Sequence, residues 1–492
     1  MNTPLRRVAL AVMGMIVLLL INATYIQVVS ADTYRADPRN RRVLLDEYSR
    51  QRGQLIAGKL SVANSEETGG QLRFKRTYLD GPMYAPVTGY YSLRYGAGGM
   101  EKSMDSVLNG SDGRLFVRRL SDLITGRDPS GGNVELTINP IVQKTAYDAL
   151  TSRGFTGAVV AIKPSTGEIL AMASTPSYDP NRLASHDGKE QEAAWNDYSS
   201  SAHGDPLNNR AVQSIYPPGS TFKLVDTAAA LEDGKATPDT QLTSASALQL
   251  QDTSTQLHNF ADEACPGGGS TVSLTQALVH SCNTAFAQLA AMIGQNDLRK
   301  QAELLGIGQQ DLSIPIPVAP STLGDIPSVA ALQQSGIGQR DVALTPLQDA
   351  VIAATIANGG VRMKPQLVKN ILGPDLSVID GFQPEQAETA MSSSTAAKIT
   401  QMMVAAENSY KDEGKIRGVQ LAAKTGTAEH GSDPKHTPPH GWYVAFGPAE
   451  NPQVAVAVLV ENGGNEGLEA TGGSLAEPIG RAVIASALQG AQ

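Results

Sequence analysis

The sequence predicts an α+β protein: an antiparallel sheet with helices, preceded by a smaller mixed or β-rich module and one N-terminal transmembrane helix. Three observations lead to this architecture. An apolar run near the N-terminus is long enough to cross a membrane, strand-like pairs occur in the middle and near the end of the chain, and helical patterns lie between them. Because helices are gathered between strand hairpins, we expect mostly antiparallel strands.

The composition restricts the class of protein. The chain has 492 residues, with 39 Lys plus Arg against 48 Asp plus Glu, a formal charge of −9. Nucleic acid is therefore an unsuitable partner, because phosphate binding needs clustered cations. A hydrophobic fraction of 41% with 18% charged residues excludes a wholly disordered chain. Two cysteines exclude a disulfide framework and a four-cysteine zinc site, and they allow at most one internal bridge.

The first expected element is a membrane anchor. Arg6 and Arg7 precede an apolar run over residues 8–29, and Asp32 follows it. These charges favour a cytoplasmic tail at residues 1–7 and a signal anchor at 8–29. A cleaved signal peptide remains the alternative, because small residues follow the run. In both cases most of the chain lies outside the cytoplasm, where a disulfide can persist.

A small extracytoplasmic module follows at residues 30–133. Its segments are short, irregular and rich in tyrosine, with no long run of helical period, so we expect a mixed or β-rich fold. A turn cluster at 128–133, Asp-Pro-Ser-Gly-Gly-Asn, is typical of a boundary. The second domain is therefore expected at 134–492.

The second domain contains alternating strand and helix signals. Apolar runs of strand length flank turn residues such as Pro164 and Gly167, and apolar residues at helical spacing occur between the strand pairs. The expected strands are 134–138, 158–162, 169–173, 419–423, 442–446 and 454–460, and the expected helices are 220–231, 274–280, 284–293 and 474–488.

Ser220-Thr-Phe-Lys223 places a hydroxyl at the start of a predicted helix and an amine one turn later on the same face. A serine becomes a strong nucleophile only when a neighbouring base takes its proton. Lysine can be that base if desolvation or a nearby cation lowers its pKa. Alone the motif is weak, because a helix N-cap also explains a serine.

Two further motifs follow along the chain. Ser281-Cys282-Asn283 lies between two helical runs, and Lys424-Thr425-Gly426-Thr427 follows a strand-like segment. A glycine in the latter motif lets a substrate backbone approach the strand, and its lysine and threonines supply donors for a carboxylate. The three motifs in this order are far less expected by chance than any one. They indicate a serine acyl-transfer site, with the identity of the acylation base left open.

With these motifs the chain resembles the class B penicillin-binding proteins over most of its length. The shared segments are residues 52–55, 99–101, 108–110, 136–139, 157–160, 164–170, 209–211, 216–219, 336–339, 345–348 and 357–360. The resemblance implies a penicillin-binding, serine β-lactamase-like transpeptidase domain on a pedestal or dimerisation-like module. The first module is shorter and more divergent than in many relatives.

The resemblance also implies roles for the motif residues. Ser220 attacks the D-Ala-D-Ala carbonyl, Lys223 is the base and Ser281 relays a proton. The substrate-binding residues are Asn283, Lys424, Thr425, Gly426 and Thr427, and the backbone N–H groups of Ser220 and Thr427 form the oxyanion hole. No metal or diffusible cofactor is implied.

The implied partners are peptidoglycan stem peptides, as D-Ala-D-Ala donor and amine acceptor, together with β-lactam antibiotics and a membrane glycosyltransferase. The implied location is the cytoplasmic membrane, single-pass, with the catalytic domain outside, and the resemblance favours cell division. The alternatives are a D,D-carboxypeptidase or β-lactam hydrolase, and a non-catalytic cell-wall scaffold or sensor. A β-lactamase is disfavoured because no Glu-x-x-Leu-Asn segment lies between Asn283 and Lys424.

Three other signals were weighed. The segment 53–59 resembles a phosphate-binding loop but lacks the final Ser or Thr, so nucleotide binding is not expected. His430, His436 and His440 suggest zinc, but two intervening prolines exclude a regular helix, and a polar loop at the cleft rim is the preferred interpretation. Cys265 and Cys282 allow a disulfide beside the second motif, and two free thiols are the equal alternative.

Overall fold

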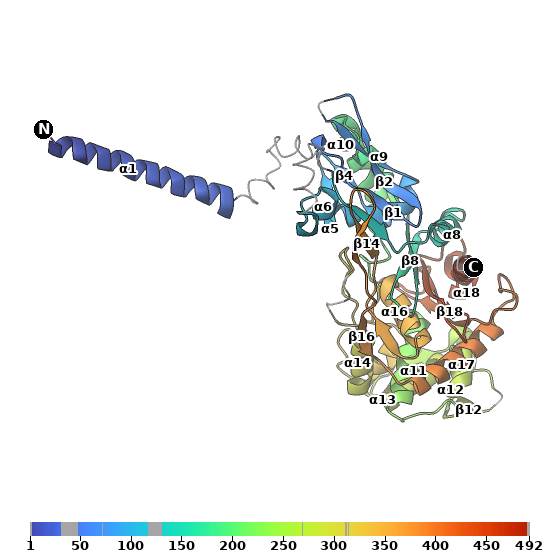
Figure 1. The fold of residues 1–492 in the computed structure, drawn as a ribbon. Coiled ribbons are helices and arrows are strands. Elements are labelled where there is room, and N and C mark those ends of the chain that lie inside the picture. Colours follow the sequence, from blue (N-terminus) through green and yellow to red (C-terminus); the bar gives the residue numbers. More distant parts are fainter. Residues whose placement is uncertain are drawn as a thin grey trace.

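The computed structural model describes residues 2–30, 48–70, 72–116, 130–267, 269–309, 312 and 314–489. Helix α1 (Asn2–Thr24) continues into a π-helical turn, η1 (Tyr25–Val29) (Figure 1). The span Thr3–Val29 has a mean hydropathy of 2.2 in its most apolar window. In length and composition this helix is compatible with a single membrane crossing.

A six-stranded sheet joins distant parts of the described chain, in the order β15-β14-β6-β1-β2-β3. Its strands are β1 (Leu55–Ala57), β2 (Leu60–Glu67), β3 (Phe74–Tyr78), β6 (Asn133–Leu136), β14 (Val368–Leu372) and β15 (Val378–Gly381). The β1–β6 pair is parallel and the other pairs are antiparallel. The expected strand at 134–138 is thus present as β6, but it pairs with both the preceding and a much later segment. The module boundary at residue 133 stays a prediction.

The N-terminal module is mixed, as predicted. Its helices are short: α4 (Gly81–Thr88), α5 (Gly99–Ser103) and α6 (Asp105–Leu108). A small hairpin, β4 (Tyr91–Ser92) with β5 (Gly96–Ala97), lies between α4 and α5. Helices α9 (Pro180–Leu183) and α10 (Gly188–Tyr198) come from later in the sequence and pack nearby, α9 against β3 and α4 and α10 against α9 (Figure 1).

A buried ion cluster holds the module together. Glu101 has no exposed surface and accepts bonds from Arg52 Nε at 2.7 Å and Arg76 Nε at 2.6 Å. Tyr78 donates to the same carboxylate at 3.1 Å. Arg76 also donates to the Gly53 carbonyl at 2.6 Å. The shared segments at 52–55 and 99–101 therefore meet in one network.

We expect Glu101→Gln to lower the free energy of unfolding by about 3–5 kcal/mol, because it leaves two buried guanidinium groups without their carboxylate. Urea titration of the detergent-solubilised full chain measures this loss. Asp105→Asn is the matched control: its carboxyl also bonds Arg52, at 2.6 Å, but is 45% exposed, so we expect a loss of at most about 1 kcal/mol. Equal losses in the two variants would contradict the central place of Glu101.

A second sheet has five described strands, all antiparallel, in the order β17-β18-β19-β7-β8. The strands are β7 (Gly157–Ile162), β8 (Ile169–Thr175), β17 (Ala422–Ala428), β18 (His440–Gly447) and β19 (Val454–Val460). The predicted hairpins at 158–173 and 442–460 are confirmed. The strand that carries the third motif differs: pairing starts at Ala422, not at 419, because its partner β18 ends at Gly447, just before Pro448.

Helices cover both faces of this sheet. On one face, Val444 and Phe446 of β18 pack in an apolar cluster with α11 (Lys223–Glu232) and α16 (Pro346–Ala357). On the other face, Tyr443 and Ala445 pack in a second cluster with α8 (Pro140–Thr151) and α19 (Glu477–Gln489). Side chains of a strand alternate between faces, so each strand contributes to both layers. Strand β17 lies at one edge of the sheet, where its outer side is free to form a site.

The remaining helices lie around the first face. They are α12 (Leu274–Val279), α13 (Asn283–Ile293), α14 (Gln295–Leu304), α15 (Val329–Ser335) and α17 (Ser393–Ser409). Short strand pairs link them: β9 (Gln241–Thr243) with β12 (Thr271–Ser273), β10 (Ala247–Gln249) with β11 (Gln256–His258), and β13 (Val361–Met363) with β16 (Gln386–Thr389).

The expected C-terminal helix is interrupted. It consists of α18 (Gly472–Leu475) and α19, which starts at Glu477. Pro478 lacks a backbone N–H and fits only the first turn of a helix, so a continuous helix across it is disfavoured.

Candidate active site

The nucleophile candidate lies on a tight turn. Ser220 belongs to a 3-10 turn, η4 (Gly219–Phe222), and α11 begins only at Lys223. This corrects the prediction of a regular helix from residue 220. Gly219 has φ +55°, and a Cβ there would come within 2.7 Å of the Thr427 carbonyl oxygen. Glycine is required at this position, and the turn is pressed against the third motif.

Lys223 is completely buried, and its amine points at polar atoms of Ser220, Ser281 and Asn283. Its Nζ is 3.0 Å from Ser220 Oγ, and it donates to Asn283 Oδ1 at 2.8 Å and to the Ser281 carbonyl at 2.7 Å. Ser281 Oγ is 3.3 Å away. The sequence motifs at 220 and 281 therefore form one cluster.

Ser281 holds this cluster in place through its backbone. It adopts φ +58°, a left-handed conformation that is uncommon for a residue with a side chain. The bend lies between α12 and α13, and Cys282 is the N-cap residue of α13. The bend directs the carbonyl of Ser281 toward Lys223 and its hydroxyl toward Lys223 and Lys424.

Lys424 on β17 completes the cluster from the other side. It too is completely buried, and its Nζ donates to Ser281 Oγ at 2.9 Å and to the Thr425 carbonyl at 2.8 Å. The Ser281 hydroxyl therefore lies between two lysine nitrogens. The structure brings together Ser220, Lys223, Ser281, Asn283 and Lys424.

Thr425 and Thr427 share one side of β17, and both are partly exposed. The Thr425 hydroxyl bonds the Tyr410 hydroxyl at 3.3 Å, and Thr427 Oγ1 accepts from the Gly472 N–H at 3.3 Å. Gly426 faces the Ser220 turn, where a Cβ would come within 2.7 Å of the Pro218 carbonyl. Its missing side chain lets the strand approach the turn.

The free edge of β17 determines where its N–H groups point. The Thr425 N–H donates to the Tyr410 hydroxyl at 3.1 Å and so points away from β18. N–H groups two residues apart on a strand point the same way. The Thr427 N–H is therefore directed to the open edge, on the side of the turn that carries Ser220.

Burial lowers the pKa of both lysines. The pKa of Lys223 is held well below its usual value by burial and then by the neighbouring Lys424, with buried Asp226 opposing the shift. Burial lowers the pKa of Lys424 to about 7. Both amines can therefore exist without charge near neutral pH.

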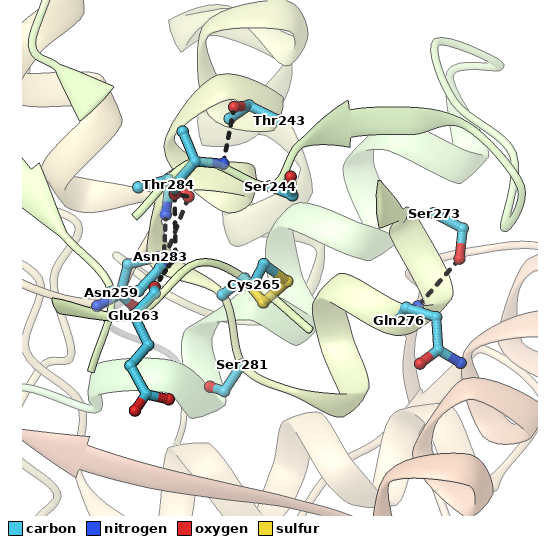
Figure 2. The surroundings of a disulfide bond; sticks show 12 residues. Thr243, Ser244, Asn259, Glu263, Cys265, Ser273, Gln276, Ser281, Asn283 and Thr284 are labelled. Atoms are coloured by element: carbon cyan, nitrogen blue, oxygen red, sulfur yellow. Dashed lines mark hydrogen bonds between the residues drawn. A yellow bond between two sulfur atoms is a disulfide. The ribbon is translucent and has the colours of Figure 1, made fainter. Parts of the chain in front are cut away.

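The two cysteines form a disulfide in the structure, with a Cα–Cα distance of 5.6 Å. Figure 2 shows Ser281 and Asn283 beside it. The Asn283 amide donates to the His258 carbonyl at 3.0 Å, and the Thr284 N–H donates to Asn259 Oδ1 at 3.0 Å. The loop before Cys265 is thus attached to the second motif at several points, and closing a loop of this size contributes about 3 kcal/mol.

Two family descriptions match this chain. Residues 157–485 match the penicillin binding protein transpeptidase domain, and residues 52–134 match the penicillin binding protein A dimerisation domain. The chain belongs to the penicillin-binding protein transpeptidase family. The first match contains all three motifs of the site.

This penicillin-binding protein has relatives that match it over nearly the full length of both chains. It is 56% identical to peptidoglycan D,D-transpeptidase PbpA of Mycolicibacterium smegmatis, over 99% of each chain. It is 55% identical to the protein of the same name from Mycobacterium tuberculosis, over the whole of both chains. A structure of penicillin-binding protein A from M. tuberculosis, as a ceftriaxone acyl-enzyme complex, superimposes with a TM-score of 0.88 at 54% identity and covers 90% of this chain and 100% of that one.

The glycine-rich segment 53–59 and the three histidines of this penicillin-binding protein lie outside the motif cluster. Residues 58–59 form the turn between β1 and β2. His440 is buried at the start of β18, so it does not belong to a polar rim loop as expected; its ring stacks on that of His430, with centroids 3.8 Å apart. His436 is 78% exposed and pairs with Asp433. Burial lowers the pKa of His440 to about 3.

Sequence reasoning missed one residue at the site of this penicillin-binding protein. Tyr410 follows the last turn of α17, and its hydroxyl accepts from both the backbone N–H and the hydroxyl of Thr425. No motif marks it, because its contact depends on how α17 packs against β17. The structure also explains the two glycines of the shared segment 336–339. A Cβ at Gly338 would come within 2.0 Å of the Gly219 carbonyl oxygen, and a Cβ at Gly336 would come within 2.5 Å of Ala290 Cβ.

Proposed function

We propose that Ser220 is the nucleophile of a peptidoglycan D,D-transpeptidase, the activity stated in the names of the full-length relatives. One observation carries the assignment. Lys223 Nζ lies 3.0 Å from Ser220 Oγ and has two close oxygen acceptors, the Ser281 carbonyl and Asn283 Oδ1.

Those two acceptors orient the amine. A neutral lysine has two hydrogens and one lone pair. With both hydrogens donated to Ser281 and Asn283, the lone pair is left facing the Ser220 hydroxyl, as a general base requires. Burial and the adjacent Lys424 favour this neutral form.

Proton transfers within this cluster accompany each bond that forms and breaks. As the Oγ–carbon bond of the acyl-enzyme forms, the Ser220 proton moves to Lys223. It passes through the Ser281 hydroxyl to the leaving nitrogen as the peptide bond breaks and D-Ala departs. The acceptor amine attacks the ester carbon, loses a proton to Lys223, and Ser220 recovers that proton as its ester bond breaks.

The third motif binds the substrate. Lys424, when protonated, has one hydrogen beyond those given to Ser281 and Thr425, and with the Thr425 and Thr427 hydroxyls it binds the terminal carboxylate. The backbone N–H groups of Ser220 and Thr427 form the oxyanion hole, supported by the direction of the Thr427 N–H. Gly426 keeps the strand against the turn, and Asn283 contacts the amide of the donor peptide.

The cellular setting is also part of the proposal. The helix Thr3–Val29 supports a retained single-pass anchor in the cytoplasmic membrane, with Arg6 and Arg7 on the cytoplasmic side and the pedestal and transpeptidase domains outside. The family resemblance supports a membrane glycosyltransferase as partner and a role in cell division. Residues 30–133 and 134–492 are the two proposed extracytoplasmic domains.

Product analysis tests the function. The full chain is incubated with a peptide ending in D-Ala-D-Ala and an amine acceptor, and the products are identified by mass. We expect the acceptor to replace D-Ala, and benzylpenicillin to leave a lasting adduct on the peptide that contains Ser220. Hydrolysis without transfer would indicate a carboxypeptidase. Consumption of benzylpenicillin without an adduct would indicate a β-lactamase, and inertness toward both would indicate a scaffold or sensor.

A further inference from the structure

Tyr410 makes a contact at the substrate side of β17 that the reaction scheme above does not use. The Thr425 N–H donates to its hydroxyl at 3.1 Å, and Thr425 Oγ1 lies 3.3 Å from the same oxygen. Tyr410 follows α17, and its own N–H donates to the Glu407 carbonyl at 3.2 Å. Hydrogen bonds therefore fix Tyr410 at its backbone N–H and at its side-chain hydroxyl.

The Tyr410 hydroxyl can both accept a hydrogen bond from Thr425 and donate one to it. A phenol oxygen accepts and its hydrogen donates. In the structure both the Thr425 N–H and Thr425 Oγ1 donate to this oxygen. When an anion binds beside Lys424, the phenol hydrogen can instead be given to Thr425 Oγ1. The threonine then turns its own hydrogen outward, to any anion bound beside Lys424. Bonds in such a chain strengthen one another.

Two observations support this arrangement. Burial raises the pKa of Tyr410 to about 12, so the hydroxyl keeps its hydrogen at physiological pH. The neighbouring carboxylate of Glu407 is engaged elsewhere, by Arg481 Nε at 2.8 Å and by the Tyr443 hydroxyl at 3.0 Å. Among the described residues, Thr425 is the side chain that Tyr410 has as a hydrogen-bond partner.

We propose that Tyr410 is a positioning residue that orients the Thr425 hydroxyl toward the substrate carboxylate. It contributes to the preference for a free C-terminal carboxylate over an uncharged end. This inference rests on the proposed function, because it assumes that Thr425 contacts the carboxylate.

Tyr410→Phe tests the proposal, with benzylpenicillin and its methyl ester as the two probes. The second-order rate constant of acylation is measured for each by intact mass. We expect the variant to lose about 3- to 10-fold with benzylpenicillin, which has the carboxylate, and less than about twofold with the ester, which lacks it. A purely structural role would slow both probes equally, and that outcome would overturn the proposal.

Tyr443→Phe is the matched control. It also removes one buried phenol hydroxyl from the same layer, the one that donates to Glu407 at 3.0 Å. Tyr443 lies opposite Thr425 on the neighbouring strand, but its hydroxyl is bonded to Glu407 and not to Thr425. We expect its ratio of the two rate constants to equal that of the wild type. An unchanged ratio in Tyr410→Phe, in a protein that still requires Ser220, would overturn the proposal alone. Acylation that does not require Ser220 would instead overturn the proposed function.

Discussion

Ser220→Ala is expected to abolish the benzylpenicillin adduct, with a fall in acylation rate on the order of 10⁶-fold. The Ser220 hydroxyl is the group that forms the acyl bond, and it lies 3.0 Å from the Lys223 amine. The Ser281 hydroxyl is 3.3 Å from that amine and accepts from Lys424 as well. Intact mass after mixing with the antibiotic measures the result directly. Ser270→Ala, which removes an exposed hydroxyl, should keep the full adduct.

An adduct that persists in Ser220→Ala would place the nucleophile elsewhere. Folding of the variant is checked by thermal unfolding. Because alanine removes one oxygen from a partly exposed turn, we expect the unfolding temperature to remain near that of the wild type.

Lys223→Met is expected to slow acylation by about 10²- to 10⁴-fold, the usual contribution of a general base. Methionine is similar in length and fills the buried site without offering a lone pair of comparable basicity to Ser220. The rate is measured under single-turnover conditions with benzylpenicillin. Lys144→Met, at a side chain that is 66% exposed, is the control and should react at the wild-type rate.

The pH dependence separates loss of a base from loss of packing. In the wild type, the rate should fall as pH drops and Lys223, whose pKa is lowered by burial and Lys424, becomes protonated. It should also fall above about pH 7, where Lys424 loses the charge that binds the carboxylate. Lys223→Met should lack the acid limb and keep the alkaline one. A variant within tenfold of the wild type, or with both limbs intact, would exclude Lys223 as the base.

The parts of the fold that the sequence could predict are local. Strands β7 and β8 are joined by a turn with Pro164 and Gly167, so a short stretch of sequence contains both strands and the turn that pairs them. The motif residues could be identified because their spacing is characteristic, and the structure brings Ser220, Lys223 and Ser281 within hydrogen-bond distance.

The parts that could not be predicted depend on contacts between distant segments. The pairing of β6 with β14 joins residues more than 200 positions apart, and no local pattern specifies it. The bond between Tyr410 and Thr425 depends on the path of the chain after α17. The buried cluster around Glu101 depends likewise on the meeting of Arg52 and Arg76.

The shared six-stranded sheet has a consequence for the order in which the protein matures. A ribosome releases β1, β2 and β3 first, but β14 and β15 follow about 300 residues later. Until then β6 exposes an unpaired edge, which invites pairing with other chains. The N-terminal strands of the nascent protein therefore cannot complete their sheet until β14 has been synthesised. We expect the nascent chain to depend most on a chaperone during this interval.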